Sequence, residues 1–156
     1  MFPLLLLPFI FSLSYSCPNG TFSSSLNTSI CYTVLEGAAG KHSWYDGEAL
    51  CQVQFNGHLA SVPNAFLNNF LNGYLDATQS KTHYWIGGTT TTASNASWTW
   101  TDGTPFTYTN WEFGDPGTGP YYCTYLEVPE ALWGSPYCSY SSSSYAFLCE
   151  FLNTNN

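Results

Sequence analysis

Carboxylates are the side chains whose type and spacing come closest to catalytic chemistry in this sequence. Glu127 and Glu130 lie three residues apart, as the acid and base of a glycoside hydrolase could. Residues three apart on a strand face opposite sides, however, and Pro129 interrupts the segment. The three histidines are scattered, and the serines form no nucleophile-elbow pattern. The sequence therefore predicts no enzyme.

The start of the chain differs in composition from the rest. An apolar run extends from Leu4 to Leu13, and the small residues Ser14 and Ser16 follow it. This pattern predicts a secretory signal peptide over residues 1–16 and a secreted, extracellular mature chain of one domain over residues 17–156. The run is short for a membrane anchor, and no second apolar stretch of that length follows. We therefore expect no transmembrane segment in the mature chain.

The cysteines of the mature part are even in number. They are Cys17, Cys31, Cys51, Cys123, Cys138 and Cys149. In an exported chain an even set predicts disulfides, although counting alone leaves fifteen pairings open. No C-x-x-C pair is present, which argues against thiolate metal sites. Because no cysteine is left over, no disulfide-linked oligomer is expected.

The charge balance restricts the partners. Ten acidic and two basic residues give a net charge of −8 and a pI near 4.3. Such a chain repels phosphate backbones, so nucleic acid is excluded as a partner. Three glycosylation sequons begin at Asn19, Asn27 and Asn95, and each predicts a surface loop.

Two helices are expected in the first half of the mature chain. Ser43 is a candidate N-cap for a helix from Trp44 to about Gln54, with Asp46 as its capping-box partner. A second helix follows Asn64, with an apolar face of Phe66, Leu67, Phe70, Leu71 and Tyr74. The asparagines at positions 68, 69 and 72 are expected on its opposite, polar face.

The second half has a different pattern. Short strand candidates lie at 85–86, 98–101, 123–128 and 146–151, separated by stretches rich in Thr, Gly, Asn and Pro. One stretch, from Gly103 to Pro120, has no regular pattern. A loop of that length inside a compact domain is typically functional. The residues alone thus indicate an α+β fold with a long functional loop.

An ordered set of short motifs runs through the mature chain. It comprises Cys17-Pro18, Cys31-Tyr32, Trp44 followed by Ala49 and Cys51, Gly57 to Ser61, Trp85-Ile86-Gly87-Gly88, Trp98-x-Trp100-x-Asp102-Gly103, Trp111, Cys123, Trp133, Cys138 and Ala146 to Glu150. From Cys17 to Glu150 the chain resembles the C-type lectin-like domain. The resemblance implies two helices packed on small antiparallel sheets, an extruded long loop, and core positions for Trp85, Trp100, Trp111 and Trp133.

The resemblance also implies a disulfide pairing. Cys51 is expected to pair with Cys149, and Cys123 with Cys138. Cys17 and Cys31 would form the additional bridge of the long form of the domain. His58 lies in the Gly57 to Ser61 framework motif and is expected to be structural.

Sugar-binding members of this family hold calcium in the long loop, and that site is largely missing here. The family's ligand triplet aligns with Asp115-Pro116-Gly117, and its next glutamate aligns with Tyr121. Its Asn-Asp pair falls on Gly134-Ser135. Calcium takes six to eight oxygens, and Asp115 is the only family ligand retained. We therefore expect no metal, no calcium-dependent sugar binding and no other cofactor.

A ligand can still be held by aromatic stacking and hydrogen bonds. The resemblance and the loop chemistry together favour a glycan or an extracellular protein as partner, with a role such as host defence or adhesion. The candidate ligand-binding residues are Glu112, Asp115, Tyr121, Tyr122, Glu127 and Ser135.

Three alternatives remain open. They are a purely protein-binding module, a calcium lectin with a site rewired through Glu112, Glu127 or Glu130, and a flat threonine surface at Thr89 to Thr92.

Overall fold

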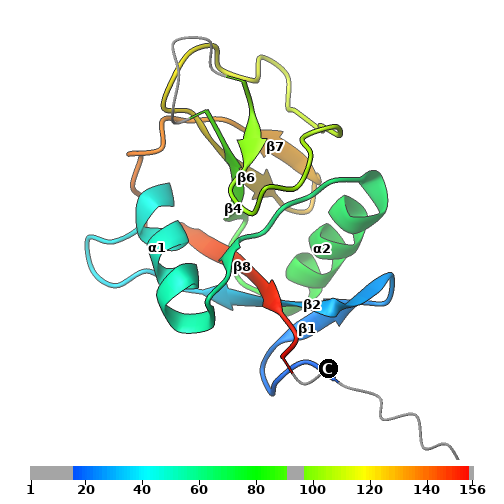
Figure 1. Cartoon of the computed structure of the whole chain (residues 1–156). Helices are drawn as coiled ribbons and strands as arrows, with labels where there is room; N and C mark the ends of the chain where they lie inside the picture. Colours follow the sequence, from blue (N-terminus) through cyan, green and yellow to red (C-terminus); the bar gives the residue numbers. More distant parts are fainter. Residues whose placement is uncertain (1–15, 91–96, 155–156) are drawn as a thin grey trace, which may run out of the picture.

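The computed structural model describes residues 16–90 and 97–154. The predicted signal peptide, apart from Ser16, and the sequon at Asn95 lie outside these residues. Within them the elements run in the order β1, β2, α1, β3, α2, β4, β5, β6, β7, β8. Figure 1 shows the two helices on either side of β8, with the yellow part of the long loop at the end of the molecule opposite β1.

Helix α1 (Trp44–Phe55) begins where the sequence predicts. The Ser43 side chain accepts a hydrogen bond from the backbone N–H of Asp46, whose carboxylate accepts one in return from the Ser43 N–H at 3.0 Å. This reciprocal pair satisfies two N–H groups that the first helical turn cannot bond internally. Trp44 and Cys51 face inward as expected.

Helix α2 (Ala65–Thr78) is present, but its buried face differs from the prediction. Asn68 is fully buried with Leu67, Leu71 and Leu75, whereas Phe66 is 76% exposed. The predicted polar position of Asn68 is therefore wrong. Its carboxamide oxygen accepts a hydrogen bond from the indole N–H of Trp133 at 2.7 Å. A buried polar group is tolerated when it is bonded in this way.

The strands form one mixed sheet. They are β1 (Phe22–Ser24), β2 (Asn27–Leu35), β3 (His58–Leu59), β4 (His83–Thr89), β5 (Thr99–Trp100), β6 (Cys123–Glu127), β7 (Leu132–Gly134) and β8 (Tyr145–Leu152). Their order is β1-β2-β8-β4-β6-β7, with β3 beside β8 and β5 beside β4. All pairs are antiparallel except β4 and β8. The predicted α+β architecture is confirmed. The parallel pairing of β4 with β8 joins the expected small antiparallel sheets into one sheet.

All three expected disulfides are present: Cys17–Cys31, Cys51–Cys149 and Cys123–Cys138. The second joins α1 to β8 across most of the chain length. The third joins the start of β6 to the segment after β7. The described residues contain no free cysteine.

The tryptophans form the centre of the core, as predicted for three of the four. Trp85, Trp100 and Trp133 are buried, while Trp111 is half-buried and packs against the cluster that contains Trp100 and Trp133. Trp85 lies in the second hydrophobic cluster, with the Cys51–Cys149 disulfide. The Trp111 and Trp133 rings meet edge to face with centroids 5.5 Å apart.

The long loop is fixed to this core through its backbone. The Glu112 N–H donates to the Trp133 carbonyl, and the Trp133 N–H donates to the Asn110 carbonyl, each at 2.9 Å. An irregular loop is thereby held in one position against β7. Across residues 16–90 and 97–154, no helix has the length and apolar character needed to span a membrane.

Candidate functional site

The carboxylate of Asp115 is bound by groups of the protein itself. The Ser135 hydroxyl donates to Oδ1 of Asp115, and the Ser135 N–H donates to Oδ2 at 3.3 Å. The Gly117 N–H donates in turn to the Ser135 hydroxyl oxygen at 2.7 Å. Hydrogen-bond donors therefore surround the one acid that the family's calcium site retains.

Glu112 lies beside this group and is also bonded. The Tyr125 hydroxyl donates to Oε1 of Glu112 at 2.8 Å. Burial raises the pKa of Glu112, and the neighbouring charges of Asp115 and Glu127 raise it further. The Tyr125 hydrogen bond acts in the opposite direction. Two acids held this close disfavour a second negative charge.

Tyr125 and Gly134 contribute to this group but were not found from the sequence. The two residues are paired directly across β6 and β7. A Cβ on Gly134 would collide with the Tyr125 hydroxyl and with Oε1 of Glu112. The missing side chain of Gly134, which the family pattern presents as a lost ligand, thus makes room for the bond between the other two residues.

The structure brings together three of the six predicted ligand-binding residues: Glu112, Asp115 and Ser135. Glu127 ends β6 and lies 3.7 Å from the His83 imidazole, with its carboxylate half-buried. The Tyr122 ring packs against the Cα of Gly117, where a Cβ would collide with it.

Three tyrosines form a surface beside the Cys123–Cys138 disulfide. The rings of Tyr122 and Tyr137 stack with centroids 4.8 Å apart. Tyr137 is 59% exposed and Tyr121 is 58% exposed. The Cys138 N–H donates to the Tyr121 carbonyl at 2.8 Å, which ties the two segments together. Tyr121, Tyr122 and Tyr137 are called the tyrosine surface below.

Calcium does not fit the residues at Asp115. A calcium ion needs several oxygen acceptors that point toward one centre. Here the Ser135 N–H and hydroxyl instead donate to the two carboxylate oxygens of Asp115, and the Gly117 N–H donates to the Ser135 hydroxyl oxygen. Among the described residues, no group of three or more His, Cys, Asp or Glu side chains could hold a metal ion.

Two other sequence hypotheses can be compared with the structure. Glu130 is exposed in the turn after β6, whereas Glu127 contacts the His83 imidazole. His58 Nδ1 lies 2.6 Å from the Glu48 carboxylate, in keeping with a structural role.

The flat threonine surface is wrong for its first two members. Thr89 and Thr90 are 4% and 2% exposed because both lie against the Tyr122 backbone, to which their hydroxyls donate hydrogen bonds at 3.4 Å. The other two, Thr91 and Thr92, lie outside the described residues.

Comparison with known families decides the identity of the fold. The sequence model of the lectin C-type domain matches residues 40–151. The chain belongs to the C-type lectin domain family. Such domains are typically binding modules without enzymatic activity.

Solved C-type lectin-like structures agree with this assignment. Human lithostathine superposes with a TM-score of 0.73 at 26% identity, covering 97% of this chain and 99% of lithostathine. A calcium-independent type II antifreeze protein gives a TM-score of 0.68 at 26% identity, covering 87% and 94%. The Ca²⁺-independent C-type lectin SPL-2 from Saxidomus purpuratus gives 0.70 at 24% identity, covering 90% and 96%. Comparison with curated protein sequences finds no match.

Proposed function

We propose that this protein is an exported lectin-like recognition module that binds a glycan or an extracellular protein without calcium. The observation that supports calcium independence is the hydrogen bonding of Asp115 by Ser135. The similar type II antifreeze protein is itself described as calcium-independent. In this proposal, the Ser135 hydroxyl and its backbone N–H take the place of a cation at Asp115.

The tyrosine surface is the proposed contact region. Tyrosine presents a large face for stacking on a sugar ring or an apolar side chain, together with a hydroxyl for hydrogen bonding. Tyr121 and Tyr137 are exposed, and the Tyr122 stack holds the Tyr137 ring in one orientation. A ligand therefore meets a preorganised surface, which lowers the entropic cost of binding.

A glycan array and a screen of extracellular proteins test this proposal, each in calcium and in EDTA. Tyr137→Ala should weaken the binding of any ligand found, and EDTA should leave that binding unchanged. Tyr45→Ala is the matched control, because Tyr45 is 44% exposed on α1. Binding that disappears in EDTA, or that survives Tyr137→Ala, contradicts the proposal.

Export and glycosylation belong to the same proposal. A signal peptide over residues 1–16 would leave a single C-type lectin domain over residues 17–156. Asn19 and Asn27 are exposed in the structure, as acceptor residues must be, but Asn27 begins β2, so the loop predicted there is wrong. N-terminal sequencing of secreted protein should begin at Cys17, and glycosidase treatment should lower its mass. A retained residue 1 contradicts the export proposal.

A rewired calcium site is the alternative that a specific observation favours. Glu112 is affected by the charges of both Asp115 and Glu127, so three acids lie within electrostatic range. A cation bound there would have to displace the Tyr125 and Ser135 hydroxyls. Calcium titration of Glu112→Gln and of the wild type separates the two cases, because only a rewired site makes the two curves differ.

A further inference from the structure

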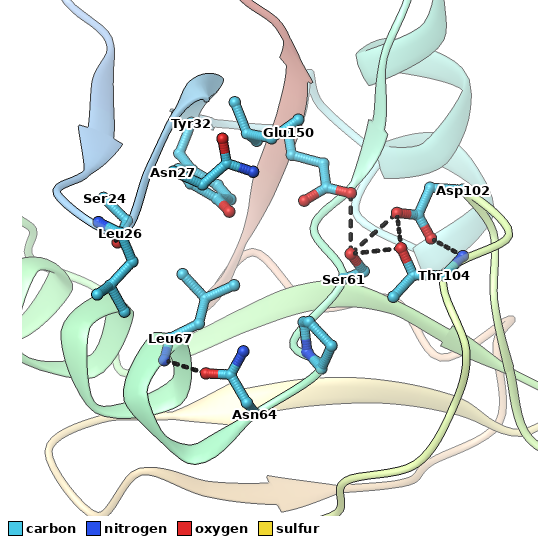
Figure 2. Close-up of a pocket in the computed structure, with 12 residues that line it drawn as sticks. Ser24, Leu26, Asn27, Tyr32, Ser61, Asn64, Leu67, Asp102, Thr104 and Glu150 are labelled. Atoms are coloured by element: carbon cyan, nitrogen blue, oxygen red, sulfur yellow. Dashed lines mark hydrogen bonds between the residues drawn. The ribbon is translucent and has the colours of Figure 1, made fainter.

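A second site of interest is a cavity of about 320 Å³ bounded by β1, β2 and the start of α2. Leu26, Ile30 and Leu67 are among its apolar residues. Ser61, Asp102, Thr104, Glu150 and Tyr32 are among its polar ones, and Figure 2 shows them gathered around the same space. The cavity contains none of the residues of the Asp115 group or of the tyrosine surface. Its volume lies at the lower end of the usual range for small-molecule sites.

The polar wall is organised around one hydroxyl. Oγ of Ser61 lies 2.9 Å from Oδ2 of Asp102 and 3.1 Å from Oε1 of Glu150 (Figure 2). A hydroxyl has one proton, so it can donate to only one of these carboxyls. Thr104 directs both its N–H and its hydroxyl at Asp102, at 3.0 and 2.6 Å. The arrangement favours a charged Asp102, which accepts both bonds from Thr104, beside a protonated Glu150.

The pKa values of the two acids agree with this geometry. Burial raises the pKa of Glu150 well above its ordinary value, and Asp102 raises it further. Burial also acts to raise the pKa of Asp102, but hydrogen bonds from Thr104, Glu150 and Ser61 outweigh it, and the pKa is lowered. One negative charge and one proton are therefore held in the wall of the cavity.

Tyr32 supplies an independent sign of a missing ligand. Its side chain is 3% exposed, and its hydroxyl has no hydrogen-bond partner among the described residues. Tyr32 lies opposite Glu150 in the β2–β8 pair, so both side chains point to the same side of the sheet. Burial raises the pKa of the Tyr32 hydroxyl, and the charges of Glu150 and Asp102 raise it further. The hydroxyl itself is not fully enclosed, so it is open to the cavity, where a ligand can bond to it.

No cation of the chain neutralises this wall. The chain has two basic residues besides histidine. Lys41 lies 3.7 Å from Asp46, and Lys81 lies 3.4 Å from Glu36. The charged or titratable neighbours of Glu150 are Asp102 after β5, Tyr32 on β2, and His58 on β3, whose ring contacts Glu48 of α1.

We propose that this cavity binds a small organic ammonium ion. The ammonium group would donate to Asp102, Glu150 and the Tyr32 hydroxyl oxygen, and its alkyl chain would lie against Leu26, Ile30 and Leu67. The ammonium N–H groups replace the proton of Glu150, which passes to solvent as the ion enters. An anion is repelled by Asp102, and a neutral alcohol leaves the negative charge unpaired.

The apolar wall distinguishes an organic ion from a metal ion. Calcium favours carboxylates, carbonyls and water around its whole shell. The cavity offers two carboxyls on one side and aliphatic side chains on the other. An ion with a polar head and an apolar tail matches both walls.

The test is a titration of the intact secreted protein with n-butylammonium chloride, followed by calorimetry in two buffers of different ionisation enthalpy. We expect saturable binding, release of up to one proton, and affinity that rises between pH 5 and 8 in buffer of constant ionic strength. n-Butanol and calcium chloride serve as matched probes and should bind at least tenfold more weakly. Equal binding of n-butanol overturns the role of charge, and tighter binding of calcium overturns the organic ligand.

Variants separate the site from the rest of the surface. Glu150→Gln should remove proton release, and Tyr32→Phe, which keeps the ring in the core, should weaken binding about threefold to tenfold. Tyr45→Phe and Glu130→Gln are the exposed controls. If Tyr32→Phe folds and binds as the wild type does, or if a control has the same effect as the cavity variants, the proposal is wrong.

Discussion

Two acidic regions of this molecule are built from the same kinds of residue. They differ in whether each carboxyl group has a hydrogen-bond donor of its own. At the loop, Asp115 and Glu112 each accept a hydrogen bond from a protein hydroxyl, contributed by Ser135 and Tyr125. At the cavity, Asp102 accepts hydrogen bonds from the Thr104 N–H and hydroxyl, whereas Glu150 has only the Ser61 hydroxyl, which it shares with Asp102. The tyrosine nearest that pair, Tyr32, has no hydrogen-bond partner within residues 16–90 and 97–154.

The difference shows how an acidic pair can be judged from its donors. Where each carboxylate has its own donor, the group is satisfied by the protein and offers little to a cation. Where one acid of a pair, here Glu150, has only a donor shared with its neighbour beside an open cavity, a ligand that brings N–H groups supplies the bonds that this acid lacks. The loop that serves calcium in sugar-binding relatives is here the satisfied region.

Removing the disulfides one at a time should give the largest loss of stability of the fold that carries both acidic regions. Cys51→Ala with Cys149→Ala should lower the free energy of unfolding by about 4–5 kcal/mol, because the bridge closes a long loop. Cys123→Ala with Cys138→Ala should lower it by about 3 kcal/mol. Denaturant unfolding measures both free-energy changes. A larger loss for the Cys123–Cys138 variant than for the Cys51–Cys149 variant would contradict the predicted order.

Single serines compare the regions more directly. Ser61→Ala should lower the free energy of unfolding by about 2 kcal/mol, since it leaves buried acid oxygens without their shared hydroxyl. Ser135→Ala should lower it by about 1 kcal/mol, because Asp115 is partly exposed to water. Ser139→Ala, an exposed control, should change nothing measurable. A larger loss for Ser135→Ala than for Ser61→Ala would reverse the comparison.

The pH dependence of stability distinguishes Glu150 from the loop acids. The folded protein keeps a proton on Glu150 that the unfolded chain releases above about pH 4.5, so this group's contribution falls as pH rises from there toward its raised pKa. The lowered pKa of Asp102 acts below 3.8, outside this window. Glu150→Gln should flatten the decline, as measured by thermal melts from pH 4 to 9. Glu130→Gln should leave the curve unchanged, and an unaltered slope in Glu150→Gln contradicts the proton assignment.

The tyrosine surface should give the smallest effect on stability. Tyr137→Ala removes an exposed ring and should change the free energy of unfolding by less than about 0.5 kcal/mol. The same variant should abolish most ligand binding if the surface is the contact region. Denaturant unfolding and ligand titration on one preparation separate the two readouts, and a large loss of stability would mark Tyr137 as structural.

Much of the fold could be predicted because its signals are local or carried by ordered motifs. The Ser43 cap and the start of α1 depend on residues three apart in sequence. The disulfide pairing followed from the resemblance and not from the cysteine count. The buried position of Asn68 could not be predicted, because its partner, Trp133, lies 65 residues away and the helical pattern showed only a polar side chain.

The candidate site was predictable in position but not in chemistry. Alignment with the family motif placed Asp115 and Ser135 at the loop, yet it showed Ser135 only as a lost ligand. Their hydrogen bond depends on the fold bringing together residues 20 apart. Tyr32 gave no signal either, because an aromatic residue after Cys31 is typical of a core strand.

Thermal unfolding with and without millimolar calcium tests calcium independence most directly. An ion that binds only the folded state must raise the unfolding midpoint. With the Asp115 carboxylate bonded by Ser135, the midpoint should be the same in calcium and in EDTA. A midpoint that rises with calcium concentration, and no longer does so in Asp115→Asn, would contradict the proposal that protein donors have replaced the metal.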